Sequence, residues 1–322
     1  MSVMRIGVLT SGGDTPGMNA AIRAVVRRGL SFGDVVLGVY HGYEGLMDGR
    51  VKQLQSSDVH GIIQRGGTIL RTARSEVFRT PEGQAKAMQL MTAYEMDALI
   101  VIGGDGSFHG AQALAELGMN VMGIPGTIDN DMGYTDFTIG FTTAVNTITD
   151  EIYKIRDTMR AHDRVGVVEV MGRNCGDIAL WSGVAGGADM IIVPEVPVDW
   201  EDCAKQLVKN KLRGQLTSIV IIAEGAGRAE DFARFVNEHT GVEAKAIVPG
   251  YIQRGGNPTA FDRVLAARLG QRAVELLADD IGGRAVGIKD NKIIDVSIEE
   301  AVEMPDRFDE KLFRFNSVLA RF

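Results

Sequence analysis

Three aspartates near the middle of the chain have the type and spacing to bind a metal ion or to accept a proton. Asp105 follows the apolar run Leu99–Ile102 in the segment LIVIGGDGS, and Asp129 and Asp131 lie in PGTIDND. A short apolar run bounded by glycines predicts a buried strand that opens into a loop lined by backbone N–H groups. Carboxylates beside such a loop suit magnesium, because this ion prefers oxygen ligands and shares phosphate oxygens with a substrate.

The elements between these aspartates decide whether their side chains can meet. Residues 99–131 have the pattern of strand, glycine loop, helix, strand and acidic loop. The carboxyl ends of parallel strands lie at one edge of a sheet, where open α/β sheets bind ligands, so we expect the three carboxylates to gather there. A tight turn would also explain GGDG alone, but it would not need the second acidic loop.

A second glycine loop follows the predicted strand Arg5–Thr10. Its Gly12 and Gly13 precede a helix predicted from about Met18 to Gly29, and the N-terminus of a helix favours anions. The spacing matches neither GxxxxGK[ST] nor GxGxxG, so it supports neither a P-loop nor a dinucleotide-binding fold. This segment is a second candidate phosphate loop.

Arginines lie near several glycine-rich segments. The pattern of residues 58–79 predicts a short helix, which is followed by a glycine pair. Arginines stand at 65, 71, 74 and 79 of this segment. Arg173 follows the predicted strand Val165–Val170, and Arg254 lies in the loop IQRGG. Scattered arginines usually lie on solvated faces. A group of them near two acidic glycine loops suits an anionic substrate.

Strand and helix patterns alternate along the whole chain. Further predicted strands are 34–40, 191–193, 218–223 and 246–248, and further helices are Thr80–Tyr94 and the segment of Val145, Ile148, Ile152, Ile155 and Met159. A strand hairpin and a last helix are predicted in KDNKIIDVSIEEAVEMP. This alternation predicts parallel sheets with helices on both faces. Tyr43, in GYEGL, is compatible with stacking on a base, but a packed surface tyrosine is the simpler interpretation.

Composition limits the function classes. The chain has 322 residues, which suits two α/β domains, and it has 45% hydrophobic and 24% charged residues. Its net charge of −8 gives no general basic field for nucleic acid. Cys175 and Cys203 have no CxxC or zinc spacing, so we interpret both as packing residues of a cytoplasmic protein. No signal peptide or membrane span is predicted.

Eight ordered motifs resemble those of the bacterial ATP-dependent 6-phosphofructokinase family. They are LTSGGDTPGMNAAIR, RGGT with TAR, IGGDGS, PGTIDND, TIGFTTA, VVEVMGRNCGD, AEG and IQRGG. The resemblance implies an α/β fold of two doubly wound domains with mostly parallel sheets. It implies a larger ATP-binding domain of residues 1–138 plus 251–305 and a smaller sugar-phosphate-binding domain of residues 139–250 plus 306–322. It also implies a cytoplasmic homotetramer with shared active sites.

The resemblance implies phosphorylation of fructose 6-phosphate at its 1-hydroxyl by ATP with Mg²⁺, giving fructose 1,6-bisphosphate and ADP. It assigns catalysis to Asp129 as the base, Arg173, Arg74 and Thr127, and the metal ion to Asp105. It assigns ATP contacts to Gly12, Arg74, Ser75, Gly104, Asp105, Gly106 and Ser107. It assigns sugar-phosphate contacts to Thr127, Ile128, Asp129, Met171, Gly172, Arg173, Glu224, Tyr251 and Arg254, with Arg164 and Lys245 from a neighbouring subunit.

This chemistry is physically coherent. Phosphoryl transfer needs the donor and the hydroxyl held in line and the transferring charge neutralised, which Mg²⁺ and two arginines would do. An aspartate with an ordinary pKa of about 3.9 is ionised at neutral pH and can accept the proton. Three positions depart from the family pattern, with Lys245 for arginine, Tyr251 for histidine and Ser75 for an aromatic residue.

Two alternative functions predict other residues at these positions. A pyrophosphate-dependent phosphofructokinase typically has an acidic residue in place of Gly106 and a lysine in place of Gly126, so glycine at both positions favours ATP. A non-catalytic nucleotide-binding regulatory subunit predicts the loss of Asp129, Asp105 or Arg173, and all three are present.

The effector site of the family is only partly matched. Arg23, Arg27, Arg156 and Arg213 keep positive charge at matching positions. Ser56, Gln215 and Thr217 stand where the family often has arginine, lysine and histidine, and Gly61 replaces an acidic residue. We therefore expect weak binding of the effectors ADP and phosphoenolpyruvate.

Overall fold

The computed structural model describes residues 3–320, and these residues form two compact units. The first unit contains residues 3–128, Met132–Thr143 and Arg254–Asp306, and the second contains Asp129–Asp131, Ala144–Gln253 and residues 307–320. The domains expected from the resemblance placed Asp129–Asp131 with residues 1–138. Their contacts are instead with the second unit, because Asp129 pairs with Arg173 and Asn130 with Asp177. Residues 1–2 and 321–322 of those domains lie outside the described residues.

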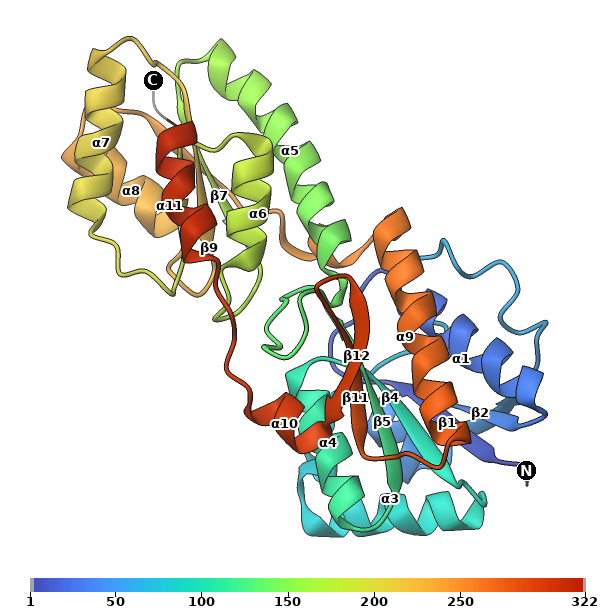
Figure 1. Ribbon diagram of the computed structural model, residues 1–322. Helices are drawn as coiled ribbons and strands as arrows, with labels where there is room; N and C mark the ends of the chain where they lie inside the picture. The colour runs from blue at the N-terminus through green and yellow to red at the C-terminus, as the bar shows by residue number, and fades with distance from the viewer. Residues whose placement is uncertain (1–2, 321–322) are drawn as a thin grey trace. The chain divides into compact units, whose positions relative to one another are not determined.

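The first unit is a mostly parallel sheet with helices on both faces (Figure 1). Its elements are β1 (Arg5–Thr10), α1 (Met18–Phe32), β2 (Val35–Val39), α2 (Gly42–Met47), β3 (Val51–Leu54), η1 (Val77–Arg79), α3 (Pro81–Ala93), β4 (Ala98–Gly103), α4 (Asp105–Glu116), β5 (Asn120–Thr127), β6 (Ile139–Gly140), α9 (Ala260–Ala278), β11 (Arg284–Lys289), β12 (Lys292–Ser297) and α10 (Ile298–Glu303). The strand order is β12-β11-β5-β4-β1-β2-β3, and β6 pairs with β5. Within the described part, β3 and β12 are the antiparallel strands.

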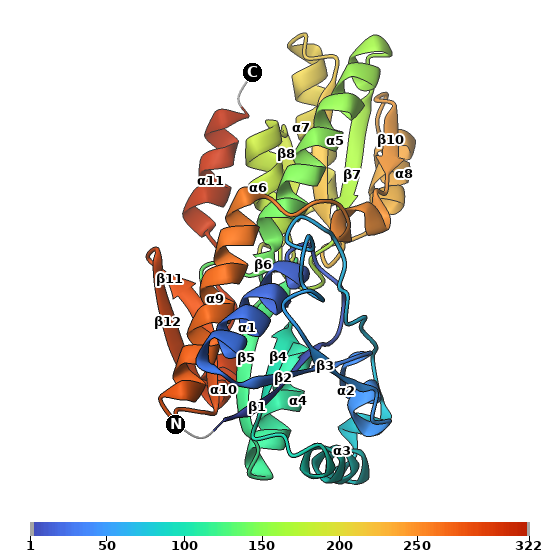
Figure 2. The same ribbon diagram turned by 90° about the vertical axis from the view of Figure 1, so that its right-hand side faces the viewer.

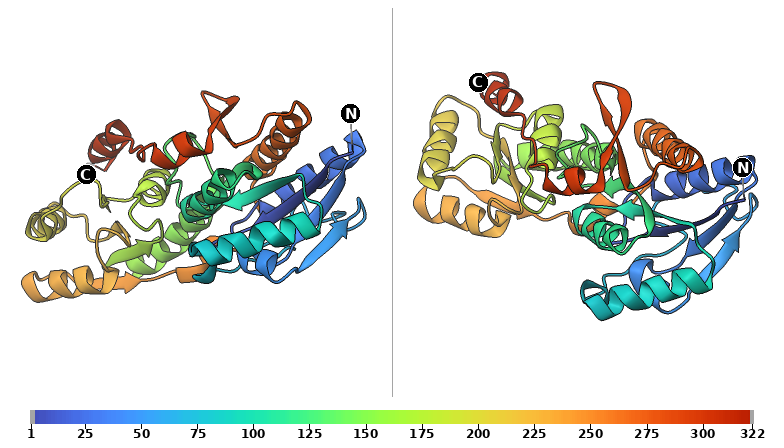
Figure 3. Two further views of the ribbon diagram at one scale, coloured as in Figure 1. Left: turned by 90° about the horizontal axis from the view of Figure 1, so that it is seen from below. Right: turned by 60° about the horizontal axis from the view of Figure 1, so that its bottom comes forward.

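Strand β4 shows why this sheet needs two helical layers. Ile100 and Ile102 pack toward α1 and α9, whereas Leu99 and Val101 pack toward α3 and α4. Every residue of β4 is buried, which is typical of a parallel strand covered on both faces. Figure 3 shows the sheet between the α1–α9 pair and α3. This sandwich fixes the carboxyl ends of β1 and β4, where the glycine loops begin.

Helices α1 and α9 lie side by side on one face of the sheet (Figure 2). A β-carbon on Gly270 of α9 would lie 2.8 Å from Ala24 Cβ of α1, so glycine permits the close approach. Leu265 and Leu269 of α9 join Val25 and Ile22 of α1 in one buried cluster with the sheet. Two segments far apart in the sequence therefore share one core.

The second unit has its own parallel sheet, in the order β10-β7-β9-β8. Its elements are α5 (Phe141–Ala161), whose first three residues belong to the first unit, β7 (Val165–Val170), α6 (Asp177–Gly186), β8 (Met190–Ile192), α7 (Trp200–Leu212), β9 (Ser218–Ala223), α8 (Ala229–His239), β10 (Ala244–Ile247), η2 (Gly250–Arg254) and α11 (Glu310–Leu319). Helices α7 and α8 cover one face, where Phe232 and Leu207 are buried against Val220. Helix α5 packs on the other face, since a β-carbon on Gly166 would lie 3.0 Å from Met159 Cγ.

Most predicted elements are confirmed, but one predicted helix is wrong and several elements were not predicted. Thr80 caps α3 as predicted, because its side chain accepts a hydrogen bond from Gly83 N–H and Pro81 follows it. The short helix predicted after Asp58 is wrong. That segment is a series of turns, with positive φ angles at Gly61 and Gly67. Strand β3 and helices α2, α7, α8, α9 and α11 were not predicted. No helix among residues 3–320 is long and apolar enough to cross a membrane.

A buried carboxylate in the first unit holds the start of α5 against the start of α9. Asp262 is fully buried, and its side chain accepts hydrogen bonds from the backbone N–H groups of Gly140 at 3.0 Å and Thr143 at 2.9 Å. The hydroxyl groups of Thr142 and Thr143 also donate to it, at 2.8 and 2.5 Å. Thr259 donates at 3.2 Å from the N-cap of α9. Five hydrogen bonds thus hold the Asp262 carboxyl group between the starts of the two helices.

Candidate active site

The two glycine loops of the first unit lie side by side. Strands β1 and β4 pair in parallel up to Thr10 and Ile102, and Ser11 N–H donates to Ile102 O at 3.0 Å. A β-carbon on Gly12 would lie 3.3 Å from Ser107 Oγ, and one on Gly103 would collide with the same hydroxyl. Both loops therefore follow the carboxyl ends of adjacent strands, as the sequence predicted.

The second of these loops forms the N-terminus of α4. Gly104 is the N-cap, and Asp105 is the first helical residue, with a side chain 47% exposed and Oδ1 3.4 Å from His109 Nδ1. Gly106 is exposed, and a β-carbon there would meet no atom within 4 Å. The first N–H groups of a helix lack partners within the helix and attract anions. This end of α4 suits a phosphate chain.

Thr127 also lies beside the N-cap of α4. It ends β5, is 9% exposed, and its Cβ would lie 3.2 Å from a β-carbon on Gly104. Its carbonyl oxygen accepts a hydrogen bond from Thr138 Oγ1 at 2.7 Å. The Thr127 backbone is therefore held at the edge of the first unit's sheet, close to the second glycine loop.

A stacked aromatic pair packs against α4. The rings of Tyr43 and Phe78 are 3.9 Å apart at an interplanar angle of 5°. The Tyr43 hydroxyl donates to Ser107 O at 2.6 Å, and burial raises the pKa of that phenol well above its ordinary value. Tyr43 is buried, so its interpretation as a surface tyrosine is wrong. Phe78 was not considered, although an aromatic residue within the arginine-rich segment is a usable signal.

Arg254 lies across the first glycine loop. It belongs to the first unit, and a β-carbon on Gly13 would collide with its guanidinium group. The same loop is held by Thr72, whose hydroxyl donates to Gly12 O at 2.8 Å. Arg74 is exposed, and Ser75 accepts a weak hydrogen bond of 3.3 Å from Phe78 N–H. Ser75 therefore acts as a turn residue here.

In the second unit, Asp129 and Arg173 form an ion pair. Arg173 Nε lies 3.3 Å from Asp129 Oδ2, and the side chains are 52% and 5% exposed, respectively. Arg173 is the third residue after β7 and has a φ angle of +54°, after Gly172 at +137°. A β-carbon on Gly172 would collide with Cys175 O, so the turn requires glycine. The half-exposed guanidinium of Arg173 therefore lies at the carboxyl edge of this sheet, beside the buried carboxylate of Asp129.

Two acceptors hold the backbone of the loop that carries Arg173. Glu224, which follows β9, accepts from the N–H groups of Gly172 at 3.2 Å and Arg173 at 2.8 Å. Gln253 is 1% exposed, and its side chain accepts from Met171 N–H at 2.9 Å. Gln253 was missed in the sequence, although it directly precedes Arg254 in IQRGG. The loop therefore keeps its shape through side-chain contacts from two separate segments.

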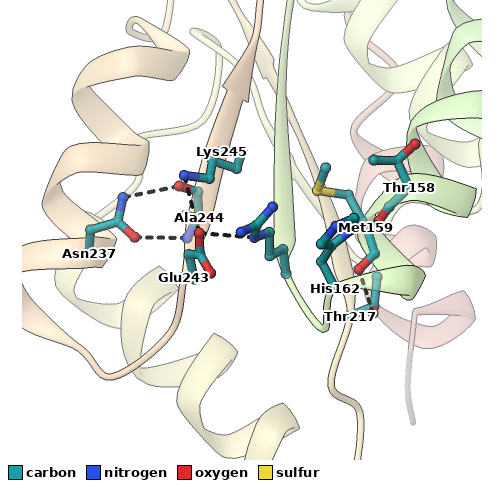
Figure 4. A network of polar contacts seen from close by, with 9 residues as sticks. Thr158, Met159, His162, Thr217, Asn237, Glu243, Ala244 and Lys245 are labelled. Carbon is teal, nitrogen blue, oxygen red and sulfur yellow. Dashed lines mark hydrogen bonds and ion pairs between the residues drawn. The ribbon is translucent and has the colours of Figure 1, made fainter.

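Arg164 and Lys245 lie at the other end of this sheet. Arg164 precedes β7, and Lys245 is at the start of β10, so both lie at the amino ends of strands whose carboxyl ends lead to Arg173. Each contacts Glu243, and Figure 4 shows Glu243 and Lys245 close together. Tyr251 is 83% exposed. Within the second unit, none of these three side chains is placed beside Asp129.

The four arginines matched to an effector site are divided between the units. Arg23 and Arg27 lie on α1, where burial, followed by the charge of Arg27, lowers the pKa of Arg23. Arg213 ends α7 and is exposed. Arg156 donates to Gly186 O and Gly187 O, both at 2.6 Å.

The three aspartates are divided between the two units. Asp105 belongs to the first unit, and Asp129 and Asp131 to the second. Among residues 3–320, no group of three histidine, cysteine, aspartate or glutamate side chains has the geometry to hold a metal ion. The expected gathering of the three carboxylates stays a prediction, because the chain passes to the other unit directly after Ile128.

The two cysteines have the packing role that was predicted. Cys175 and Cys203 are both buried and free. Burial raises the pKa of both thiols, to about 11 for Cys203. Thiols with raised pKa values are poor nucleophiles at neutral pH.

Comparison with known proteins agrees with these motifs. The family model described as Phosphofructokinase matches residues 5–277. ATP-dependent 6-phosphofructokinase of Clostridium tetani is 56% identical over 316 residues, covering 98% of this chain and 99% of that protein. The protein of the same name from Alkaliphilus metalliredigens is 54% identical, with the same coverage of both chains.

Solved structures show the same fold. Phosphofructokinase from Saccharomyces cerevisiae aligns with a TM-score of 0.87 and 36% identity, over 99% of this chain and 48% of the yeast chain. This chain thus spans about half the length of that relative. Pyrophosphate-dependent phosphofructokinase from Marinobacter aquaeolei has a TM-score of 0.88 at 22% identity, over 98% of this chain and 88% of that one. At that identity the likeness concerns the fold alone.

Proposed function

The chain belongs to the phosphofructokinase family, and we propose that its first unit binds ATP and its second unit binds and activates fructose 6-phosphate. The reaction transfers the terminal phosphoryl group of ATP to the sugar 1-hydroxyl, giving ADP and fructose 1,6-bisphosphate, a step of glycolysis. The observation that supports this division most is the Asp129–Arg173 pair in the second unit, apart from the glycine loops of the first.

In this proposal, Asp129 accepts the proton of the 1-hydroxyl. Arg173, with Arg74 from the first unit, neutralises the transferring phosphoryl oxygens. The 3.3 Å contact from Arg173 keeps the carboxylate oriented before the sugar arrives. Glu224 and Gln253 fix the backbone that carries Arg173, so its guanidinium starts from a defined position. Phosphoryl transfer depends mainly on such positioning and on charge neutralisation.

The first unit supplies a loop suited to the phosphates of ATP. Gly12, Gly104, Gly106 and Ser107 place backbone groups and a helix N-terminus there, and Gly106 leaves open space. Asp105 fits a magnesium ligand, because its exposed carboxylate begins α4 and Mg²⁺ is commonly held by one or two carboxylates plus phosphate oxygens. Bound there, Mg²⁺ would neutralise charge on the phosphates.

The remaining sugar-phosphate contacts are proposed to come from two subunits. Thr127, Ile128, Met171, Gly172, Glu224, Tyr251 and Arg254 would act within one chain, and Arg164 and Lys245 would come from a neighbouring copy in a homotetramer. The position of Arg164 and Lys245 at the amino ends of β7 and β10 supports this, because their own chain's Asp129–Arg173 pair is at the opposite edge. A cytoplasmic location also stays a prediction.

A coupled assay of ADP release with and without fructose 6-phosphate tests the proposed function. We expect release only when ATP, Mg²⁺ and the sugar phosphate are all present. Equal release without the sugar would contradict a sugar kinase, and no release under any condition would favour the non-catalytic alternative.

We predict that ATP supports turnover and pyrophosphate does not. Gly106 leaves room for a nucleotide, and glycine at position 126 offers no long side chain that could hold a short donor. The Gly106→Asp variant should lower kcat/KM for ATP at least about tenfold, since its carboxylate would repel the phosphates. The reaction is measured with each donor at saturating fructose 6-phosphate, and similar kcat/KM values for the two donors would contradict the prediction.

We also predict a weak response to ADP and phosphoenolpyruvate as effectors. Gln215, which replaces a cation, donates to Asp189 at 2.5 Å, and Arg156 already donates to two carbonyl oxygens. Each missing charge-assisted hydrogen bond is worth about 1.5–3 kcal/mol. Saturation curves for fructose 6-phosphate should shift little at millimolar effector. A strongly sigmoidal shift at low effector concentration would show that neighbouring arginines compensate.

A further inference from the structure

We infer that the carboxylate of Glu243 competes with the substrate phosphate for the cations Arg164 and Lys245. This inference rests on the proposed function, in which both cations contact the phosphate of fructose 6-phosphate. It gives a role to a carboxylate that the sequence motifs left unassigned. In this role, Glu243 sets the affinity of the phosphate site without touching the reacting atoms.

Strand pairing brings the three side chains together. Ala244 pairs with Val165, and Val165 N–H donates to Glu243 O at 2.9 Å, so Glu243 lies next to Arg164 on the neighbouring strand. Glu243 and Lys245 flank Ala244, and residues two apart on an extended chain point to the same side. Lys245 pairs with Gly166, which offers it no side chain. The register of β10 with β7 therefore brings the charged groups of Arg164, Glu243 and Lys245 together.

A side chain of α8 fixes this part of the edge strand. Asn237 Oδ1 accepts from Ala244 N–H at 2.8 Å, and Asn237 Nδ2 donates to Ala244 O at 3.0 Å (Figure 4). On the other side, Arg164 N–H donates to Met159 O at 3.1 Å, at the end of α5. Both backbones are anchored, so the cluster is formed before any ligand binds.

One carboxylate oxygen serves both cations. Glu243 Oε1 lies 2.9 Å from Arg164 Nε and 3.1 Å from Lys245 Nζ. The side chains of Arg164, Glu243 and Lys245 are 29%, 48% and 51% exposed. The contacts with Arg164 and then with Lys245 lower the pKa of Glu243, so it is ionised at neutral pH. The three residues together carry one net positive charge.

A phosphate group needs the two cations that Glu243 contacts. A phosphate monoester carries about −1.5 to −2 charge at pH 7 and accepts the same hydrogen bonds as a carboxylate. It must either displace Glu243 from Arg164 and Lys245 or lie beside another negative charge, and both lower its affinity. Exposed ion pairs are weak, so displacement is feasible and its cost is measurable.

The Glu243→Gln variant tests this role, because it keeps the shape of the side chain and removes its charge. We expect KM for fructose 6-phosphate to fall about two- to tenfold, with kcat and KM for ATP unchanged. The decrease should shrink as salt is added, because exposed charges are screened. Glu243→Asp, which keeps the charge, should stay closer to the unaltered protein. Glu238→Gln removes the same charge from an exposed position on α8 and should leave KM unchanged.

An unchanged or raised KM for fructose 6-phosphate in Glu243→Gln would overturn the inference. Lys245→Met separates this failure from failure of the proposed function. If Lys245→Met raises KM for fructose 6-phosphate alone while Glu243→Gln changes nothing, the phosphate site stands and only the competitor is wrong. If Lys245→Met leaves that KM unchanged, the phosphate site is wrongly assigned, and the role of Glu243 is overturned with it.

Discussion

Replacing Asp129 with asparagine lowers kcat by roughly 10²–10⁴-fold, the usual contribution of general base catalysis, while KM for both substrates stays within a few-fold. Asparagine has nearly the same shape and keeps an oxygen that can accept from Arg173, now 3.3 Å away, so the site should keep its form. It cannot accept the proton of the sugar hydroxyl. Steady-state kinetics with each substrate varied in turn measures the effect.

Asp202→Asn is the matched control for this variant. Asp202 is an exposed carboxylate on α7 that pairs with Lys205 at 3.2 Å, so its loss removes the same charge from the same unit. We expect its kcat to equal that of the unaltered protein. If the Asp129→Asn variant keeps most of its kcat, Asp129 is not the general base.

The Asp262→Ala variant should lose roughly 3–5 kcal/mol of unfolding free energy. Truncation leaves the N–H groups of Gly140 and Thr143 buried without their acceptor, and the threonine hydroxyls around Asp262 lose theirs. Whole domains are stable by only about 5–15 kcal/mol, so this loss is a large fraction of the total. Asp262→Asn keeps one acceptor oxygen and should have a smaller effect.

Urea unfolding followed by circular dichroism measures this loss, with Asp279→Asn as the control. Asp279 is exposed at the other end of α9, so its change should stay within about 0.5 kcal/mol. Trp181 and Trp200 both belong to the second unit, so their fluorescence reports that unit separately. A circular dichroism midpoint equal to that of the control, or a shift seen only in the tryptophan signal, would contradict the role of Asp262 in the first unit.

Strands buried on both faces were the elements best predicted from the sequence. Arg5–Thr10, Val165–Val170 and Ser218–Ala223 were predicted to the residue, because a short, mostly apolar run that leads into a glycine-containing loop has few other interpretations. Elements that depend on distant partners were missed. α2 begins at Gly42 after a residue with positive φ, and α11 is stabilised by packing on β8 and α6 rather than by its own pattern.

The site was predictable where it follows the ends of parallel strands. The glycine loops after β1 and β4, and the position of Arg173 after β7, come from that rule. Arg164 and Lys245 lie at amino ends, where the rule gives no expectation, and they were found through a family pattern alone. The contact of Arg254 with Gly13 depends on folding across more than 200 residues, which local sequence does not encode.

The pairing of α1 with α9 sets an order of events while the ribosome makes this protein. Roughly 230 residues separate the two helices, so at about 5–20 residues per second α1 waits on the order of 10–50 s for its partner. The sheet of the second unit, with α5 to α8, emerges complete before α9 does. The middle of the chain can therefore fold first, while the apolar face of α1, with Ile22 and Val25, remains a substrate for chaperones until α9 covers it.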